Sequence, residues 1–194
     1  MKPSSRTTYL GLNLRTCSIR LLSEEDADAL QRYANNRKIW ENLRDIFPHP
    51  YSLQDAQAFL DFAIKARPEA DFAITNETEA IGCIGLRLGN DVHRHTAELG
   101  YWLGEPFWSR GIMTEAITAF TPFAFRWFEL LRIFAQPFAG NTASARVLEK
   151  AGFVCEGRLK ANVVKDGKFF VSLMYARVRE PPVIYRTRGV TPYW

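Results

Sequence analysis

The pattern of hydrophobic and polar positions along this chain predicts a succession of strands and helices. Short apolar or alternating runs are typical of strands, and they cover residues 14–22, 72–75, 80–88, 97–103, 132–138, 153–157, 160–164 and 169–178. Apolar residues at helical spacing predict helices after the capping residues Ser23 and Ser52, around residues 39–43, from Ile112 through Trp127, and over residues 142–151. We therefore expect an α+β fold with a mixed, mainly antiparallel sheet of about seven strands and helices on both faces.

Turn signals and length set the expected boundaries. Asp166-Gly167 between two strand-like runs is a strong hairpin signal. A chain of 194 residues fits one domain with a sizeable core. We expect an N-terminal tail over residues 1–13, a single domain over residues 14–178, and a C-terminal tail over residues 179–194. The aromatic residues of that last tail can pack on the body or on a partner.

The segment around Gly111 carries the first chemical signal. A strand over residues 97–103 leads through Trp108-Ser109-Arg110-Gly111 into the helix that begins at Ile112. The first amide groups of a helix have no partner within it, and they lie at the positive end of its dipole. Glycine permits a tight turn and Arg110 adds a cation, so the segment suits a phosphate or diphosphate. The plain alternative is an ordinary helix entry with a solvated arginine, since neither the P-loop motif nor the dinucleotide glycine motif is present.

A second unit of the same kind follows. Residues 132–138 predict a buried strand, Ala139-Gly140-Asn141 a turn, and Thr142 the start of a helix that Gly152 ends. Asn141 is a favourable residue for capping that helix. The two units together read strand–turn–helix–strand–turn–helix–strand.

These residues resemble the GNAT superfamily of acetyl-coenzyme A-dependent N-acetyltransferases, and within it the RimJ/RimL-like branch of ribosomal-protein N-terminal acetyltransferases. The resemblance spans about Leu14 to Arg177. It rests on the motifs Glu98-Leu99-Gly100-Tyr101-Trp102-Leu103, Trp108 to Ala116, Asn141-x-x-Ser144, Leu148-Glu149-Lys150-x-Gly152-Phe153 and Glu156-Gly157. One departure lies in the phosphate turn, where the pattern Q/R-x-x-G-x-G/A keeps Gly111 but has Trp108 and Met113 at its outer positions.

The resemblance implies acetyl-coenzyme A as co-substrate and a V-shaped splay between two parallel strands, here residues 98–103 and 132–138. The pantetheine arm would enter that splay as an added strand would, because extended backbone in a buried cleft needs hydrogen-bond partners. An oxyanion donor is expected among the backbone N–H groups near Trp102 or Leu103. The expected cofactor-binding residues are Trp102, Leu103, Ser109, Arg110, Gly111, Ile112, Met113, Thr114, Asn141 and Ser144. Side chains alternate along a strand, so at most one of Tyr101 and Trp102 is expected to face the cleft.

The resemblance also suggests the catalytic residues. A base is expected at Glu98, on the strand before the phosphate turn, or at Glu156, after Gly152-Phe153, and the two can share the role. The plain alternative for each is a carboxylate at the surface or at a sheet edge. Leu148 stands where many members have a tyrosine general acid, whereas Ser144 matches the serine used in the RimL-like branch. Its hydroxyl can hydrogen-bond the departing sulfur, or it can simply fill the first turn of its helix.

Composition narrows the classes of partner. The formal net charge of +4 suits an acidic ligand and is too small to indicate nucleic-acid binding. Three widely spaced cysteines and three histidines form no metal or redox motif. No apolar run is long enough to span a membrane, and the N-terminus lacks the apolar segment of a signal peptide. We expect a cytoplasmic protein without metal, nucleic-acid or membrane partner.

The function expected from the resemblance is acetyl transfer to a primary amine, with the α-amine of a protein N-terminus as the first choice of acceptor. At pH 7 an α-amine is roughly 10–15% neutral and a lysine only about 0.04%, so the N-terminal acceptor needs the weaker base. A small amine such as a polyamine, an amino acid or an antibiotic stays open as the acceptor. A catalytically idle domain that binds coenzyme A or a partner protein also stays open, as does the choice between monomer and homodimer.

Overall fold

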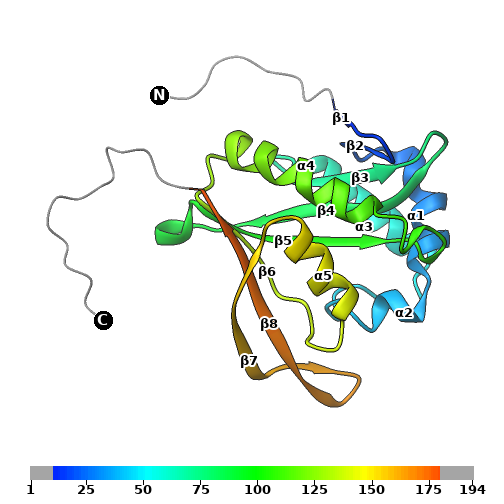
Figure 1. Ribbon diagram of the computed structural model, residues 1–194. Helices are drawn as coiled ribbons and strands as arrows, with labels where there is room; N and C mark the ends of the chain where they lie inside the picture. The colour runs from blue at the N-terminus through cyan, green and yellow to red at the C-terminus, as the bar shows by residue number, and fades with distance from the viewer. Residues whose placement is uncertain (1–10, 180–194) are drawn as a thin grey trace, which may run out of the picture.

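The computed structural model describes residues 11–179 and contains one eight-stranded mixed sheet with helices on both faces (Figure 1). The strands lie in the order β1-β2-β3-β4-β5-β6-β8-β7. Their bounds are β1 Leu12–Asn13, β2 Ser18–Leu21, β3 Asp71–Thr75, β4 Ala80–Leu88, β5 Thr96–Leu103, β6 Arg132–Ala135, β7 Val154–Lys165 and β8 Lys168–Val178. The helices are α1 Ala27–Ala34, α2 Arg37–Trp40, α3 Leu53–Lys65, α4 Ile112–Trp127 and α5 Thr142–Lys150, with short 3-10 turns at Glu24–Asp26, Asp91–His93 and Glu105–Phe107.

Local sequence signals account for several element ends. Ser52 and Asp55 cap α3 reciprocally, each side chain accepting a hydrogen bond from the other's backbone N–H. Asp166 and Gly167 both have positive φ, 53° and 71°, as a two-residue hairpin turn between β7 and β8 requires. The expected hairpin is therefore confirmed.

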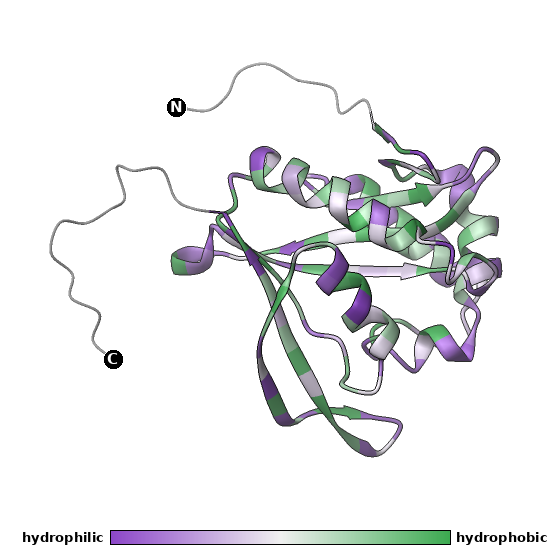
Figure 2. Ribbon diagram, in the orientation of Figure 1, coloured by the Kyte–Doolittle hydropathy of each residue, from purple (hydrophilic) through white to green (hydrophobic). Residues whose placement is uncertain are grey.

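The sheet is covered by a different helix layer on each face. On one face α4 packs on the apolar side chains of the central strands, and Phe72 meets Phe120 edge to face at 5.4 Å. On the other face α1 and α3 pack on small residues such as Ala73 and Cys83. Figure 2 shows hydrophilic and hydrophobic residues alternating around α4. This two-sided packing holds the middle of the sheet rigid.

Two elements differ from expectation. The first strand predicted over residues 14–22 is shortened to β2, because the Leu14 N–H donates to the Cys17 carbonyl at 2.9 Å and closes a turn before it. A further strand, β1, precedes that turn and lies within the expected N-terminal tail over residues 1–13. Regular structure thus begins at Leu12, and the sheet has eight strands rather than about seven. The strand predicted over residues 132–138 ends at Ala135, since Pro137 lacks the N–H that a ladder needs. The aromatic residues of the expected C-terminal tail lie outside the described residues.

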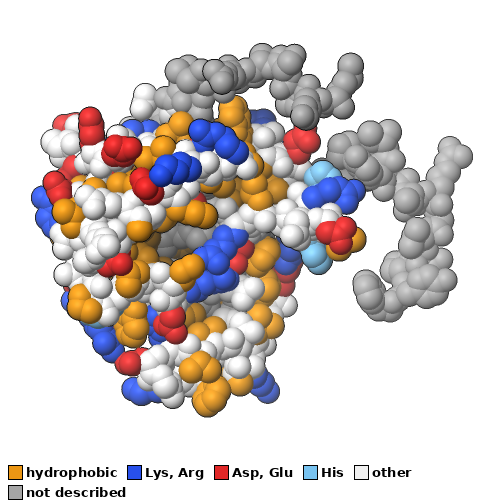
Figure 3. Space-filling model, turned by 180° about the vertical axis from the view of Figure 1, so that it is seen from behind, with side chains coloured by type: hydrophobic (Ala, Val, Ile, Leu, Met, Phe, Trp, Pro, Cys, Tyr) orange, Lys and Arg blue, Asp and Glu red, His pale blue; other side chains and the backbone are white. Residues whose placement is uncertain are grey.

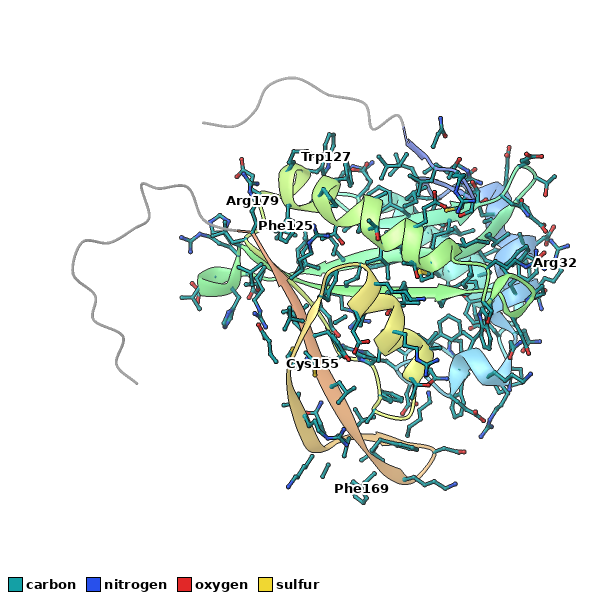
Figure 4. The ribbon with its side chains drawn as sticks, in the orientation of Figure 1. Arg32, Phe125, Trp127, Cys155, Phe169 and Arg179 are labelled. Carbon is teal, nitrogen blue, oxygen red and sulfur yellow. The ribbon has the colours of Figure 1, made fainter. Side chains whose placement is uncertain are left out.

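Phe120→Ala tests the α4 face of the core. Phe120 is fully buried, so its truncation should lower the free energy of unfolding by about 3–5 kcal/mol in urea titrations. The matched control is Phe169→Ala on the outer hairpin, where the ring is 75% exposed (Figure 4) and the change should stay within about 0.5 kcal/mol. Similar losses for the two variants would contradict this account of the core.

Candidate active site

The two parallel strands of the sheet separate soon after they meet. β5 pairs with β6 over three residue pairs only, ending at Glu98 with Phe134. β5 then continues along β4 as far as Leu103, while β6 pairs with β8 on its other side. Within residues 11–179, the edge of β5 that faces β6 has no strand partner beyond Glu98. The expected splay is thus confirmed, and it exposes backbone polar groups that can take an added extended ligand.

A cleft of about 2020 Å³ runs past this splay. Its walls come from β5, the N-terminal turn of α4 and the first turns of α5 on one side, and from the segment before α3 and the β7–β8 hairpin on the other. Figure 3 shows a hollow in the surface with Lys and Arg side chains beside it. The volume suffices for a ligand of cofactor size together with a second substrate.

The turn before α4 has the backbone of an anion seat. Ser109 and Gly111 both have positive φ, 60° and 79°, so the chain curls before the helix begins. Among residues 11–179 no side chain caps α4, and the Glu115 N–H is the first to bond back, to the Gly111 carbonyl at 3.0 Å. The amide groups of residues 112–114 therefore have no acceptor among the described residues.

The side chains of this turn play different parts. Ile112 and Met113 are buried in the core, so only their backbone amides can serve a ligand. The Arg110 guanidinium lies 5.9 Å from the centre of the Phe107 ring, and Arg110 alone of the predicted residues 109–114 does not line the cleft. The Trp108 indole N–H donates to the Leu103 carbonyl at 2.6 Å and ties the turn to the end of β5.

A half-buried hydroxyl pair joins β5 to α5. Tyr101 Oη and Ser144 Oγ are 2.6 Å apart and share a hydrogen bond. Burial raises the pKa of Tyr101 to about 12, so the phenol keeps its proton at neutral pH. Asn141 caps α5, its Oδ1 accepting from the Ser144 N–H at 3.0 Å. Ser144 is therefore held by both of its neighbours at the mouth of the splay.

Tyr101 and Trp102 both line the cleft, which corrects the expectation that at most one would do so. Their side chains do alternate: Tyr101 packs with the α4 layer and Trp102 with the α1 and α3 layer. Because β5 has lost its neighbour here, the cleft reaches both faces of the sheet. The sequence pattern gives no chemical role to the Tyr101 hydroxyl, which is recognised only through its contact with Ser144.

Glu98 lies in the cleft but is already paired. Both of its carboxylate oxygens accept hydrogen bonds from Arg44 Nη2, at 2.5 and 2.6 Å. Its side chain is 19% exposed, on the α1 and α3 side of the splay. Arg44 comes from the segment before α3, far from Glu98 in sequence, so no local pattern could have revealed the pair.

Glu156 does not lie with the other predicted catalytic residues. It occupies a bulge of the edge strand β7 and does not line the cleft. Arg132 holds it in a two-pronged ion pair, one bond measuring 2.9 Å, and the hydrogen bonds from Arg132 lower the pKa of the Glu156 carboxyl. Its position supports the alternative of a sheet-edge carboxylate, because the paired guanidinium draws it away from the splay.

The tip of the β7–β8 hairpin closes the far wall of the cleft. Lys165 is buried, with its ammonium 3.6 Å from the centre of the Trp40 ring and 2.8 Å from Asp45 Oδ1. Arg37 of α2 reaches Asp166 at 2.6 Å. These contacts hold the hairpin against α2 and the segment that follows it.

None of the helices in residues 11–179 is long and apolar enough to cross a membrane. The same range holds no cluster of three or more His, Cys, Asp or Glu side chains placed to bind a metal ion.

Comparison with known proteins gives a consistent result. The profile of the Acetyltransferase (GNAT) domain family matches residues 17–154. The probable N-acetyltransferase YjcK of Bacillus subtilis is 32% identical over 160 residues, which are 79% of this chain and 88% of that protein. The ribosomal protein uS5-alanine N-acetyltransferase of Escherichia coli is 30% identical over 159 residues, which are 78% of this chain and 81% of that protein.

A solved structure shares the whole architecture. The RimL ribosomal L7/L12 α-N-protein acetyltransferase, determined in complex with coenzyme A, superimposes with a TM-score of 0.77 at 23% identity, covering 87% of this chain and 97% of that one. The segment matched by the family profile contains the parted strands, the uncapped start of α4 and the Tyr101–Ser144 pair. The chain therefore belongs to the GNAT acetyltransferase family and is an N-acetyltransferase with ribosomal-protein acetyltransferases of the RimJ/RimL type among its relatives.

Proposed function

We propose that this protein transfers an acetyl group from acetyl-coenzyme A to the α-amine of a protein N-terminus. The observation that carries the proposal is the opening of the sheet after Glu98. The uncapped start of α4 lies beyond the Leu103 end of that opening, and the Tyr101–Ser144 pair lies beside its middle. A diphosphate fits the free amides at the start of α4, and an amide-bearing arm fits the free edge of β5.

The residues present fit coenzyme A. The amides of residues 111–114, with the turn at Ser109, suit the diphosphate, and Arg110 adds long-range positive charge from outside the cleft. The free edge of β5 near Trp102 and Leu103 suits the pantetheine amides and offers N–H groups to an oxyanion. The Asn141 side-chain N–H₂ donates to no described residue, so it is available to a pantetheine carbonyl. When bound, acetyl-coenzyme A supplies an acetyl group activated as a thioester.

Ser144 is assigned to the departing sulfur. Either hydroxyl of the Tyr101–Ser144 pair can donate; we assign Tyr101, protonated at neutral pH, as the donor to Ser144 Oγ, which leaves the serine O–H free to turn into the cleft. A hydroxyl that is fixed by a donor on one side points its own proton to the other. Leu148 stands where many family members have a tyrosine general acid, and in this chain Ser144 would protonate the departing sulfur instead.

An α-amine is the favoured acceptor on physical grounds. Deprotonating a lysine at pH 7 costs about 3.5 kcal/mol more than deprotonating an α-amine, at about 1.36 kcal/mol per pKa unit. The relatives named for uS5 alanine and for the α-amine of L7/L12 act on protein N-termini. The aromatic wall of Phe47, Tyr51 and Trp102 gives the acceptor half of the cleft an apolar lining for a peptide.

The direct test of the function is thiol release from acetyl-coenzyme A with matched peptide acceptors. One peptide has a free α-amine, and the other has a blocked N-terminus and an internal lysine. We expect the free α-amine to react at least about 100-fold faster at pH 7. Equal rates with the two peptides, or activity confined to polyamines and aminoglycosides, would contradict the proposed acceptor. Binding of coenzyme A without thiol release from acetyl-coenzyme A with any amine would instead support a catalytically idle domain.

Gly111→Val tests the anion seat. Valine resists the left-handed conformation at φ 79°, so the turn must shift and its amides must move. We expect the Kd for coenzyme A, measured by calorimetry, to rise about tenfold, which corresponds to about 1.4 kcal/mol. The Kd for S-acetylpantetheine, which has no diphosphate, should stay unchanged.

The matched control is Gly167→Val, which places the same residue at φ 71° in the hairpin turn. It imposes the same backbone strain away from α4, so the Kd for coenzyme A should remain that of the wild type. An equal rise in the Kd for coenzyme A in both variants would contradict the assignment of this turn as the diphosphate site. A rise in the Kd for both ligands in Gly111→Val would contradict it as well.

Ser144→Ala tests the thiol role. Loss of the hydroxyl should lower kcat about 100-fold and leave the Kd for coenzyme A within about twofold, because general acid catalysis is worth about 10²–10⁴. Tyr101→Phe should lower kcat by a smaller factor of about ten, since Ser144 keeps its hydroxyl but loses its orientation. Thr142→Ala removes an exposed hydroxyl from the same helix and should leave kcat unchanged. An unaltered kcat in Ser144→Ala would reject the assignment.

A further inference from the structure

Asp71, the first residue of β3, places its carboxylate over the floor of the cleft. In the register of the sheet Asp71 pairs with Gly85 of β4, and Gly85 pairs with Gly100 of β5. Paired residues on neighbouring strands share a face, so these three form one row. A Cβ added to Gly85 would stand 2.1 Å from Asp71 Oδ1. The carboxylate therefore fills the space of the side chain that Gly85 lacks, and it leans toward β5.

The space over Gly100 is open. A Cβ added there would meet no heavy atom of the described residues within 4 Å, and Gly100 lines the cleft two residues beyond the last β5–β6 pair at Glu98. Paired Cα atoms on antiparallel strands are about 5 Å apart. Because Asp71 Oδ1 already lies above Gly85, a nitrogen atom over Gly100 is within its reach, directly or through one water.

Asp71 differs from the other carboxylates of the cleft in having no hydrogen-bond donor among residues 11–179. The remaining cleft carboxylates all accept such bonds: Glu41 from Arg37, Asp45 from Lys165, Asp55 from Ser52 and Glu98 from Arg44. Burial raises the pKa of the Asp71 carboxyl, and the charge of Arg87 opposes that shift. A half-buried carboxylate without a protein donor is a favourable site for a cationic N–H group.

The charged and titratable groups around Asp71 come from every element packed near it. They are Arg20 on β2 with Asp26, Cys83 and Arg87 on β4, Glu98 on β5 with Arg44, Tyr51 and Asp55 at the start of α3, and Arg67 after α3 with Glu69. Arg20, Arg44 and Arg67 are each bound to another carboxylate. Arg87 is thus the cation that acts on Asp71, and it is exposed at the rim.

We infer that Asp71 binds the ammonium group of the acceptor and takes its proton, so that the free amine forms over Gly100. In this step an N–H bond of the ammonium breaks and the proton joins a carboxylate oxygen of Asp71. The electron pair left on nitrogen then attacks the carbonyl carbon of the acetyl thioester and forms the C–N bond. The C–S bond breaks with its electron pair going to sulfur, the nitrogen loses its second proton, and the thiolate takes up one proton through Ser144. The Asp71 carboxyl returns the first proton to water in the open cleft. This inference rests on the proposed function, and it gives Glu98 the task of holding Arg44 in place.

Asp71→Asn tests the inference through the pH dependence of kcat/KM for an N-terminal peptide. The wild type can bind the ammonium form of the peptide, whereas the variant can use only the peptide whose α-amine has already lost its proton to bulk water. We expect the variant to be about 50-fold slower at pH 7 and within about threefold at pH 9, because an α-amine with a pKa near 7.8 is neutral there. Glu98→Gln should lower kcat/KM by the same factor at pH 7 and at pH 9.

A second readout needs no turnover. With coenzyme A, which has no acyl group, the Kd of the peptide at pH 7 should rise about tenfold in Asp71→Asn, while the Kd of coenzyme A stays unchanged. Asp61→Asn, an exposed carboxylate of α3 that pairs with Lys65, is the matched control and should alter neither quantity.

The outcomes separate the inference from the function on which it rests. A loss in Asp71→Asn that is equal at both pH values, unchanged peptide binding, or a pH-dependent loss in Glu98→Gln instead would overturn the role of Asp71. If the wild type releases no thiol with any α-amine, the proposed function itself fails. Thiol release that responds to pH as described, together with weakened peptide binding, supports both.

Discussion

The site depends on one constraint, the loss of β5's parallel neighbour after Glu98. β6 ends at Ala135, and the chain then follows β8 and leaves β5, with the Pro137 carbonyl accepting a hydrogen bond from the Leu173 N–H at 2.9 Å. β5 is meanwhile held in place along its other edge by β4 as far as Leu103. A strand that is fixed on one side and bare on the other presents ordered hydrogen-bonding groups at little cost in conformational entropy. Both halves of the cleft open from this point.

Contacts between distant elements keep the opening in shape. The Trp108 indole ties the turn before α4 to Leu103, and the hydroxyls of Tyr101 and Ser144 tie α5 to the middle of β5. Glu115, in the first turn of α4, accepts hydrogen bonds from the backbone N–H groups of Arg15 and Thr16 in the β1–β2 turn. The start of α4 is therefore anchored from two directions, and its free amides are presented by a rigid support.

The sequence predicts the features that are determined locally. The Ser52 capping box, the Asp166-Gly167 turn and the turn at Gly111 each depend on a few adjacent residues, and each is found where the pattern indicates. Features that depend on strand register could not be predicted. The row of Asp71 and two glycines arises from pairing across three strands, and nothing in the sequence around Asp71 singles it out. The ion pairs of Glu98 and Glu156 are likewise long-range, so each glutamate looked equally available as a base.

Amide hydrogen exchange with and without coenzyme A tests the central claim most directly, because it reports on the backbone groups that the account places in contact with the ligand. Coenzyme A should slow the exchange of amides in residues 99–103 and 109–114, while the edge strand β7 around Glu156 should exchange as before. Unchanged exchange in both of those segments under saturating coenzyme A, or protection concentrated elsewhere, would contradict the assignment of the parted strands as the cofactor site.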